Sequence, residues 1–127
     1  MYRSAWENII KTKRYEYYPD DLGPIVRIIG DGITTKRIDF EVLNYQNHKL
    51  QASFFHTGES PNPDTPCILY MHSHSGNRLE GLPITKLVSD NFSVCLFDFS
   101  GAGISEGKYV SLGKKEAFDI QAIFDVL

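Results

Sequence analysis

Two short apolar runs, each followed by a polar loop, decide the fold of this chain. Residues 67–78 read CILYMHSHSGNR, and residues 94–107 read VCLFDFSGAGISEG. Each run is continuously apolar at its start, which is typical of strands that a parallel sheet buries on both faces. Between them, residues 79–89 predict a helix, and its inward side is expected to carry Leu79, Leu82, Leu87 and Val88. The order strand, helix, strand predicts a right-handed parallel unit.

The sequence before this unit predicts antiparallel strands. Residues 37–44 and 49–55 alternate polar and apolar positions, so they predict a hairpin turning at 44–48. A short strand is expected at 26–29 before a glycine turn at 30–32, and a short helix at 4–12. Residues 15–24 are rich in aromatic residues and proline, and predict an extended wrapping segment. The chain divides at residue 36 into an N-terminal helix with this segment and a second part, 37–127.

The last segment, residues 113–127, predicts a helix. Its apolar residues recur at helical spacing and are expected on one buried face: Ala117, Ile120, Ile123, Phe124 and Leu127. The predicted fold class is therefore α/β, with a mixed sheet in which an antiparallel hairpin precedes parallel strands, flanked by helices. The sheet is expected to be incomplete, because a doubly wound fold would next require a strand.

Composition restricts the function. The chain has 127 residues and a net charge of −3, so bulk electrostatics indicate neither a nucleic-acid nor an anionic-membrane partner. Its apolar runs are too short to span a bilayer, and the N-terminus lacks a signal-peptide pattern, which predicts a cytoplasmic protein. Cys67 and Cys95 lie within the apolar runs, so both are expected to be buried core residues rather than a disulfide or a metal pair.

The loop that starts at His72 allows three interpretations. Loops at the carboxyl ends of parallel strands bind ligands in α/β sheets, so this loop is a candidate oxyanion loop. His72 and His74 are alternatively a pair of metal ligands for a metal-dependent hydrolase, although a full set of three or four ligands is hard to assemble from four histidines. In the third interpretation His72 only anchors the loop and His74 is a surface residue.

The loop after the second strand contains a deceptive motif. Residues 103–107 fit Gly-x-Ser-x-Gly, the spelling of a nucleophile elbow, but six residues separate Asp98 from Ser105 and no helix follows at once. Every histidine also precedes Ser105, which is the wrong order for a catalytic triad in this fold. The run also misses a dinucleotide-binding fingerprint, because Glu106 stands where the third glycine belongs. Ser105 is therefore expected to be structural.

Taken together, the two loops resemble the α/β-hydrolase superfamily, in its serine aminopeptidase S33-like group, which includes monoacylglycerol-lipase-like enzymes. In that group an apolar strand ends in His-Gly and is followed by a loop such as Asn-Ser-Gly-Ser-Arg. The next strand ends in Asp-x-x-Gly-x-Gly-x-Ser-x-Gly, and residues 98–107 match every fixed position. This chain departs from the pattern at Ser73, which replaces the glycine after His72. A Cβ at that position is expected to strain the loop if its φ is positive.

The resemblance implies a role for each matching residue. The backbone N–H of His74 would be one oxyanion donor, within an oxyanion loop that contains Ser73. The remaining matched residues would shape the two loops: His72, Gly76, Asp98, Gly101, Gly103 and Ser105. The resemblance covers residues 37–127 and implies no cofactor and no metal.

The resemblance also implies serine-type hydrolysis of an ester, thioester or amide through an acyl-enzyme, with a small-molecule or peptide acyl substrate for the full-length parent. Nucleophile, acid and catalytic histidine are not identifiable in this chain, so a truncated protein, inactive alone, is expected. The strand at 67–71 would then be an open sheet edge, which predicts self-association. The alternative function is a non-catalytic binding or regulatory fragment that a partner strand completes.

Overall fold

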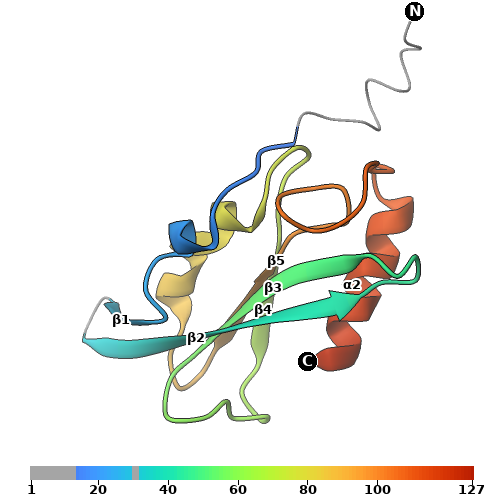
Figure 1. The fold of residues 1–127 in the computed structure, drawn as a ribbon. Helices are drawn as coiled ribbons and strands as arrows, with labels where there is room; N and C mark the ends of the chain where they lie inside the picture. Colours follow the sequence, from blue (N-terminus) through green and yellow to red (C-terminus); the bar gives the residue numbers. More distant parts are fainter. Residues whose placement is uncertain (1–13, 30–31) are drawn as a thin grey trace, which may run out of the picture.

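The computed structural model describes residues 14–29 and 32–127. The helix predicted at 4–12 and most of the turn predicted at 30–32 lie outside the described residues. The strands are β1 (Val26–Ile29), β2 (Ile33–Leu43), β3 (Lys49–His56), β4 (Cys67–Met71) and β5 (Ser93–Phe97). Within these described residues, the helices are the 3₁₀ helices η1 (Pro19–Leu22) and η2 (Arg78–Leu87) and the α-helix α2 (Lys114–Val126) (Figure 1).

The five strands form one mixed sheet in the order β1-β2-β3-β5-β4. β2 and β3 pair antiparallel, which confirms the predicted hairpin, and β1 joins β2 antiparallel at one edge. β5 runs antiparallel to β3 but parallel to β4. The predicted fold class is thus confirmed. The predicted boundary at residue 36 falls inside β2, so segments on both sides of it contribute to the same sheet.

The sheet has an apolar core on each face, and β5 is central to both. Cys95 and Phe97 point into a core with Ile123 of α2, whereas Val94 and Leu96 point into a second core with Val88, just after η2. All five residues of β5 are buried, as the continuous apolar run predicted. Because β5 is buried on both faces, the position of its last residue is fixed. Asp98, the first residue of the following loop, is therefore fixed as well.

β4 does not meet the prediction of two-sided burial. Its middle residues are half-buried and both of its ends are exposed, because in the described part of the chain β4 pairs only with β5 and forms the edge of the sheet. The expectation of two buried cysteines is correct for Cys95 but wrong for Cys67, which is exposed at the start of β4. The sequence pattern of β4 is that of an interior strand, whereas its place in the described sheet is an edge.

The helix predicted at 79–89 is a 3₁₀ helix instead of an α-helix. Pro83 lies in its interior, where it has no N–H to donate and restricts the backbone. Its buried positions are Arg78, Gly81 and Thr85. Leu87, expected inside, is 54% exposed, while Leu79 and Leu82 are half-buried and Val88 is buried as predicted.

The predicted C-terminal helix is confirmed as α2, but its buried face is narrower than expected. Ile123 is buried, whereas Ala117, Phe124 and Leu127 are exposed, because no described residue covers that side of the helix. Asp119 takes a buried inward position that the apolar pattern did not assign. Among the described helices, none combines the length and the apolar character needed to cross a membrane.

Candidate functional site

Two loops lie side by side at the carboxyl ends of β4 and β5. We call residues 72–78 the first loop and residues 98–107 the second loop. His72 joins them: its Nε2 accepts the backbone N–H of Phe99 at 3.1 Å, and its Nδ1 donates to the carbonyl of Ser73 at 2.8 Å. The His72 ring also meets the Phe99 ring edge to face, 5.0 Å between centroids. The parallel pairing of β4 and β5 brings the two loops together, as the sequence predicted.

The geometry argues against the metal interpretation. Both ring nitrogens of His72 are engaged in hydrogen bonds, so neither is free to bind a metal ion. His74 is exposed, and the described residues hold no group of three or more His, Cys, Asp or Glu side chains placed to hold a metal. His72 instead acts as an anchor between the loops.

The strain expected at Ser73 is absent, because Ser73 does not have positive φ. The residue with positive φ is Ser75, at 64°, and the turn closes with a hydrogen bond from the N–H of Gly76 to the carbonyl of Ser73 at 2.9 Å. Both the backbone N–H and the hydroxyl of Ser73 donate to Glu80, in the first turn of η2. Glu80 was not recognised in the sequence, where it reads as an ordinary surface residue near a helix start.

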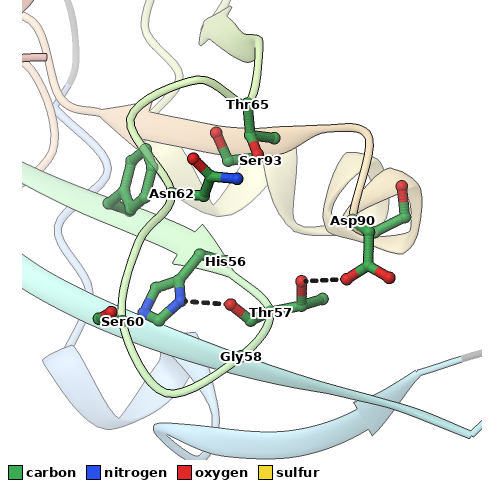
Figure 2. A pocket seen from close by; sticks show the side chains of 10 residues that line it. His56, Thr57, Gly58, Ser60, Asn62, Thr65, Asp90 and Ser93 are labelled. Atoms are coloured by element: carbon green, nitrogen blue, oxygen red, sulfur yellow. Dashed lines mark hydrogen bonds between the residues drawn. The ribbon is translucent and has the colours of Figure 1, made fainter.

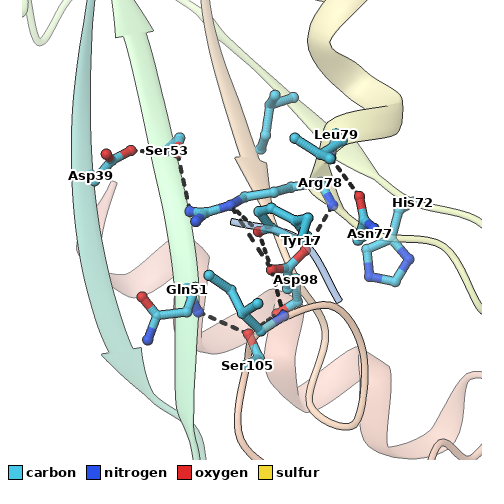
Figure 3. Close-up of polar contacts among 12 residues, drawn as sticks. Tyr17, Asp39, Gln51, Ser53, His72, Asn77, Arg78, Leu79, Asp98 and Ser105 are labelled. Carbon is cyan, nitrogen blue, oxygen red and sulfur yellow. Dashed lines mark hydrogen bonds and ion pairs between the residues drawn. The ribbon is translucent and has the colours of Figure 1, made fainter. Parts of the chain in front are cut away.

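Asp98 organises both loops from a fully buried position (Figure 3). Its Oδ1 accepts the backbone N–H of Arg78 at 2.7 Å, and its Oδ2 accepts the N–H of Ile104 at 3.2 Å and the hydroxyl of Tyr17. The buried Arg78 side chain lies beside it, with Nε 3.9 Å from Oδ2. One carboxylate therefore fixes the end of the first loop, the middle of the second loop and the N-terminal segment.

Tyr17 and Arg78 extend this network across the sheet. The Arg78 Nε donates to the hydroxyl of Tyr17, and its Nη1 donates to the hydroxyl of Ser53 on β3 at 3.1 Å. Ser53 in turn donates to Asp39 on β2 at 2.6 Å. Burial raises the pKa of Tyr17 far above its ordinary value, and the negative charge of Asp98 raises it further. Tyr17 therefore remains a neutral donor, and the wrapping segment predicted at 15–24 contributes it.

Ser105 lies inside the second loop with its hydroxyl fully used. It is 1% exposed, donates to the carbonyl of Asp98 at 2.7 Å, and accepts the N–H of Gln51 on β3 at 2.8 Å. A nucleophile needs an accessible oxygen and a neighbouring base, and here the contacts are backbone groups. This arrangement favours a structural role for Ser105 over the nucleophile that its motif spells.

The glycines of the second loop make room for these contacts. Gly101 and Gly103 have positive φ, at 83° and 50°. A Cβ at Gly103 would lie 2.4–2.5 Å from the carboxylate of Asp98, and one at Gly101 would lie 2.7 Å from the carbonyl oxygen of Tyr109. Glycine is required at both positions by conformation and by close approach.

A second buried carboxylate, Asp119 on α2, holds the other side of this loop. It accepts the N–H of Ser100 and the side-chain amide of Asn44, both at 2.9 Å. Burial raises its pKa, and these hydrogen bonds offset part of that effect. The sequence offered one signal for Asp119: it stands four residues before Ile123, on the inward stripe of the helix.

Ser100 and His48 form a serine–histidine pair that the sequence did not suggest. The Nδ1 of His48 lies 2.8 Å from the Oγ of Ser100. The same Oγ also lies 3.2 Å from the carbonyl oxygen of Glu106. Ser100 is buried, and the pair fastens the β2–β3 turn to the second loop.

A cavity of about 230 Å³ opens between the two loops and the start of α2. Its apolar lining comes from Met71, Phe99, Ala102, Val110 and Leu112, and its polar lining residues are His72, Ser73, His74, Ser75 and Glu116. Within the described part of the chain, the backbone N–H groups of His74 and Ser75 make no hydrogen bond to another protein group. An oxyanion loop requires backbone donors that no protein acceptor occupies.

A different cavity, of about 280 Å³, lies at the opposite end of β5 (Figure 2). His56, Thr57, Asp90 and Ser93 line it, and Thr57 donates to Asp90 at 3.2 Å across its mouth. The imidazole of His56 bonds to the adjacent carbonyl of Thr57. None of the residues predicted for function lies in this cavity.

Comparison with known proteins supports the fold. No protein-family model matches the sequence, and no curated protein matches it. The esterase Pf2001 of Pyrococcus furiosus is similar in two crystal forms: the TM-scores are 0.67 and 0.64, the identities 23% and 24%, and 94% and 91% of this chain is covered. A hypothetical protein of Pseudomonas aeruginosa is also similar, with a TM-score of 0.62 and 16% identity over 91% of this chain.

This chain spans 42% and 41% of the two esterase chains and 36% of the Pseudomonas protein. At such low identity the likeness shows the fold alone, a mixed sheet with flanking helices.

Proposed function

We propose that this chain forms the oxyanion-loop portion of a serine-type acyl hydrolase of the S33-like group, with residues 37–127 as the N-terminal half of the hydrolase domain. In this proposal the backbone N–H of His74 stabilises the negative oxygen of the tetrahedral intermediate. The observation that carries the proposal is that His74 lines the cavity between the loops and that its backbone N–H has no acceptor among the described residues. The esterase-like fold supports it.

The cavity also favours a class of substrate. Its apolar lining and small volume suit the acyl chain of an ester, a thioester or an amide, while charged groups are few. Of its lining residues, Glu116 is the acid, and its carboxylate is held by the N–H and hydroxyl of Ser111. The described residues offer no activated nucleophile, so the nucleophile, its acid and its histidine would belong to further sequence of the parent enzyme.

The test is hydrolysis of p-nitrophenyl acetate and butyrate by the product of the complete reading frame. His74→Pro removes the N–H, and His74→Ala keeps it, so the two variants form a matched pair. The proposal predicts that kcat falls about 10²–10³-fold in His74→Pro and changes little in His74→Ala. Circular dichroism of both variants separates a lost fold from a lost donor.

Three outcomes would refute the proposal. The first is a reading frame that ends at codon 127, the second is absence of esterase activity in the complete product, and the third is equal kcat in folded His74→Pro and His74→Ala. A fluorophosphonate probe adds an independent check. It should label a serine beyond residue 127 and leave Ser105 unlabelled.

The open edge of β4 favours a second candidate function, a binding or regulatory module completed by a partner strand. In the described part of the chain, β4 pairs with β5 alone, and its outer backbone groups are available to another strand. Light scattering and hydrogen exchange on the 127-residue chain test this. A monodisperse monomer with fully protected β4 amides would exclude it.

A further inference from the structure

Glu80 reaches back from the first turn of η2 onto the first loop and holds one residue there with both carboxylate oxygens. Its Oε2 accepts the backbone N–H of Ser73 at 2.8 Å, and its Oε1 accepts the hydroxyl of Ser73 at 2.5 Å. The hydroxyl of Tyr70, on β4, donates to Oε2 at 3.3 Å. This carboxylate therefore connects the strand, the loop and the helix that follows.

Gly76 shows how closely the carboxylate lies on the loop. A Cβ built at Gly76 would lie 1.9 Å from Oε1 of Glu80 and 2.9 Å from the hydroxyl oxygen of Ser73. Any side chain at position 76 would push Glu80 off Ser73. The glycine at 76, the serine at 73 and the glutamate at 80 thus act as one unit.

This unit explains the departure from the family pattern at position 73. Ser73 has ordinary φ, so a Cβ is accepted there, and Glu80 supplies the acceptor that the added hydroxyl needs. The hydrogen bonds also stabilise the charged carboxylate. Burial alone would raise the pKa of Glu80, but the hydrogen bonds from Ser73 outweigh it, and the pKa is lowered.

Two neighbouring backbone N–H groups of the first loop differ in their hydrogen bonding. Glu80 takes the N–H of Ser73, while the next N–H, that of His74, has no partner in the described residues. We infer that Glu80 is a positioning residue of this loop, which fixes Ser73 through its N–H and its hydroxyl and leaves the N–H of His74, a residue that lines the cavity, without a protein acceptor. The part of this inference that concerns an oxyanion rests on the proposed function.

Amide hydrogen exchange, measured by NMR on the 127-residue chain, tests the inference without any catalytic assay. In the wild-type chain, the Ser73 amide should be protected and the His74 amide should exchange freely. Glu80→Ala should accelerate exchange at Ser73 about 10–100-fold, the loss expected for a hydrogen bond to a charged acceptor. Glu80→Gln keeps one acceptor oxygen, so it should restore part of the protection.

Two controls separate positioning from general stability. Amides in the β2–β3 pairing should keep their exchange rates in every variant, which shows that the fold survives. Ser73→Gly removes the hydroxyl but leaves the N–H, so it should lose less Ser73 protection than Glu80→Ala does. Glu59→Gln, on an exposed loop, should change nothing.

Two results would overturn the inference: unchanged Ser73 exchange in Glu80→Ala, or a His74 amide that is as protected as Ser73 in the wild-type chain. The exchange result is independent of the proposed function. If Glu80→Ala frees Ser73 but the complete protein hydrolyses no ester, the hydrolase proposal fails while the role of Glu80 in holding the loop stands.

Discussion

Replacing Asp98 by Asn tests the central claim that one buried carboxylate holds both loops. The substitution keeps the shape but removes the charge, so the guanidinium of Arg78, 3% exposed, is left without a carboxylate. Depending on the orientation of the new amide, the N–H of Arg78 or that of Ile104 also loses its acceptor. Removing one partner of a buried ion pair costs about 3–5 kcal/mol.

This loss is a large part of the free energy of unfolding of the chain. A domain of this size has a free energy of unfolding of about 5–15 kcal/mol, so Asp98→Asn should remove about a fifth of it or more. The assay is urea unfolding followed by far-UV circular dichroism. With a denaturant slope of about 1–3 kcal/mol per molar urea, the midpoint should fall by about 1–5 M. Asp64→Asn, on the exposed loop before β4, is the matched control and should leave the midpoint unchanged.

A double variant separates the effect of the unpaired charge on stability from other causes of the lost stability. Arg78→Met removes the guanidinium, so combining it with Asp98→Asn leaves no unpaired charge in the core. The double variant should be less destabilised than the sum of the two single variants. A loss below about 1 kcal/mol in Asp98→Asn, or strict additivity in the double variant, would refute the reasoning.

Three further predictions concern the second loop and α2. Gly103→Ala should destabilise the chain by at least about 2 kcal/mol more than Gly58→Ala, because both glycines have positive φ but a Cβ at 103 would clash with Asp98, whereas at 58 the nearest atom is 3.9 Å away. Equal losses in thermal unfolding would contradict the clash. Ser105→Ala should cost about 1–3 kcal/mol by leaving buried backbone groups unpaired, and should not change serine-probe labelling. Burial alone would raise the pKa of Glu116, but the hydrogen bonds that its carboxylate accepts from Ser111 outweigh burial, and the pKa is lowered from its ordinary value. The ionised carboxylate therefore stabilises the fold at neutral pH, and this stability is lost as the pH falls through the lowered pKa. Glu116→Gln should flatten the decrease of stability between pH 6 and pH 3, and an unchanged slope would count against this assignment.

The sequence predicted the strands well because their hydrophobic patterns follow directly from burial. The continuous run at 94–97 belongs to the one strand that is buried on both faces, and the alternating residues 37–44 and 49–55 form the hairpin. The η2 segment was predicted as an α-helix because its leucines suit helical spacing, whereas Pro83 and the close approach of Gly81 to the sheet impose a tighter turn. A Cβ at Gly81 would lie 2.5 Å from the side chain of Leu96.

The motifs singled out some residues of the two loops and gave no signal for their partners. Asp98, Gly103 and Ser105 are among the motif residues, and in the structure they lie close together around the buried carboxylate of Asp98. Tyr17 and Glu80 contribute through contacts with residues that the sequence does not mark, since Tyr17 lies 81 positions from Asp98 and Glu80 reads as a solvated helix residue. Partners of this kind follow from tertiary packing, and single-sequence patterns do not encode them.

The contact of Tyr17 with Arg78 and Asp98 has an evolutionary consequence. The three side chains share one buried ion pair, and the phenol satisfies both members by accepting from the arginine and donating to the carboxylate. A mutation at any of these positions changes which residue types are compatible with the fold at the other two positions, although the three lie far apart in the sequence. In an alignment of relatives, positions 17, 78 and 98 should therefore change as a set, so that a relative with an apolar residue at 98 also lacks the arginine and the tyrosine.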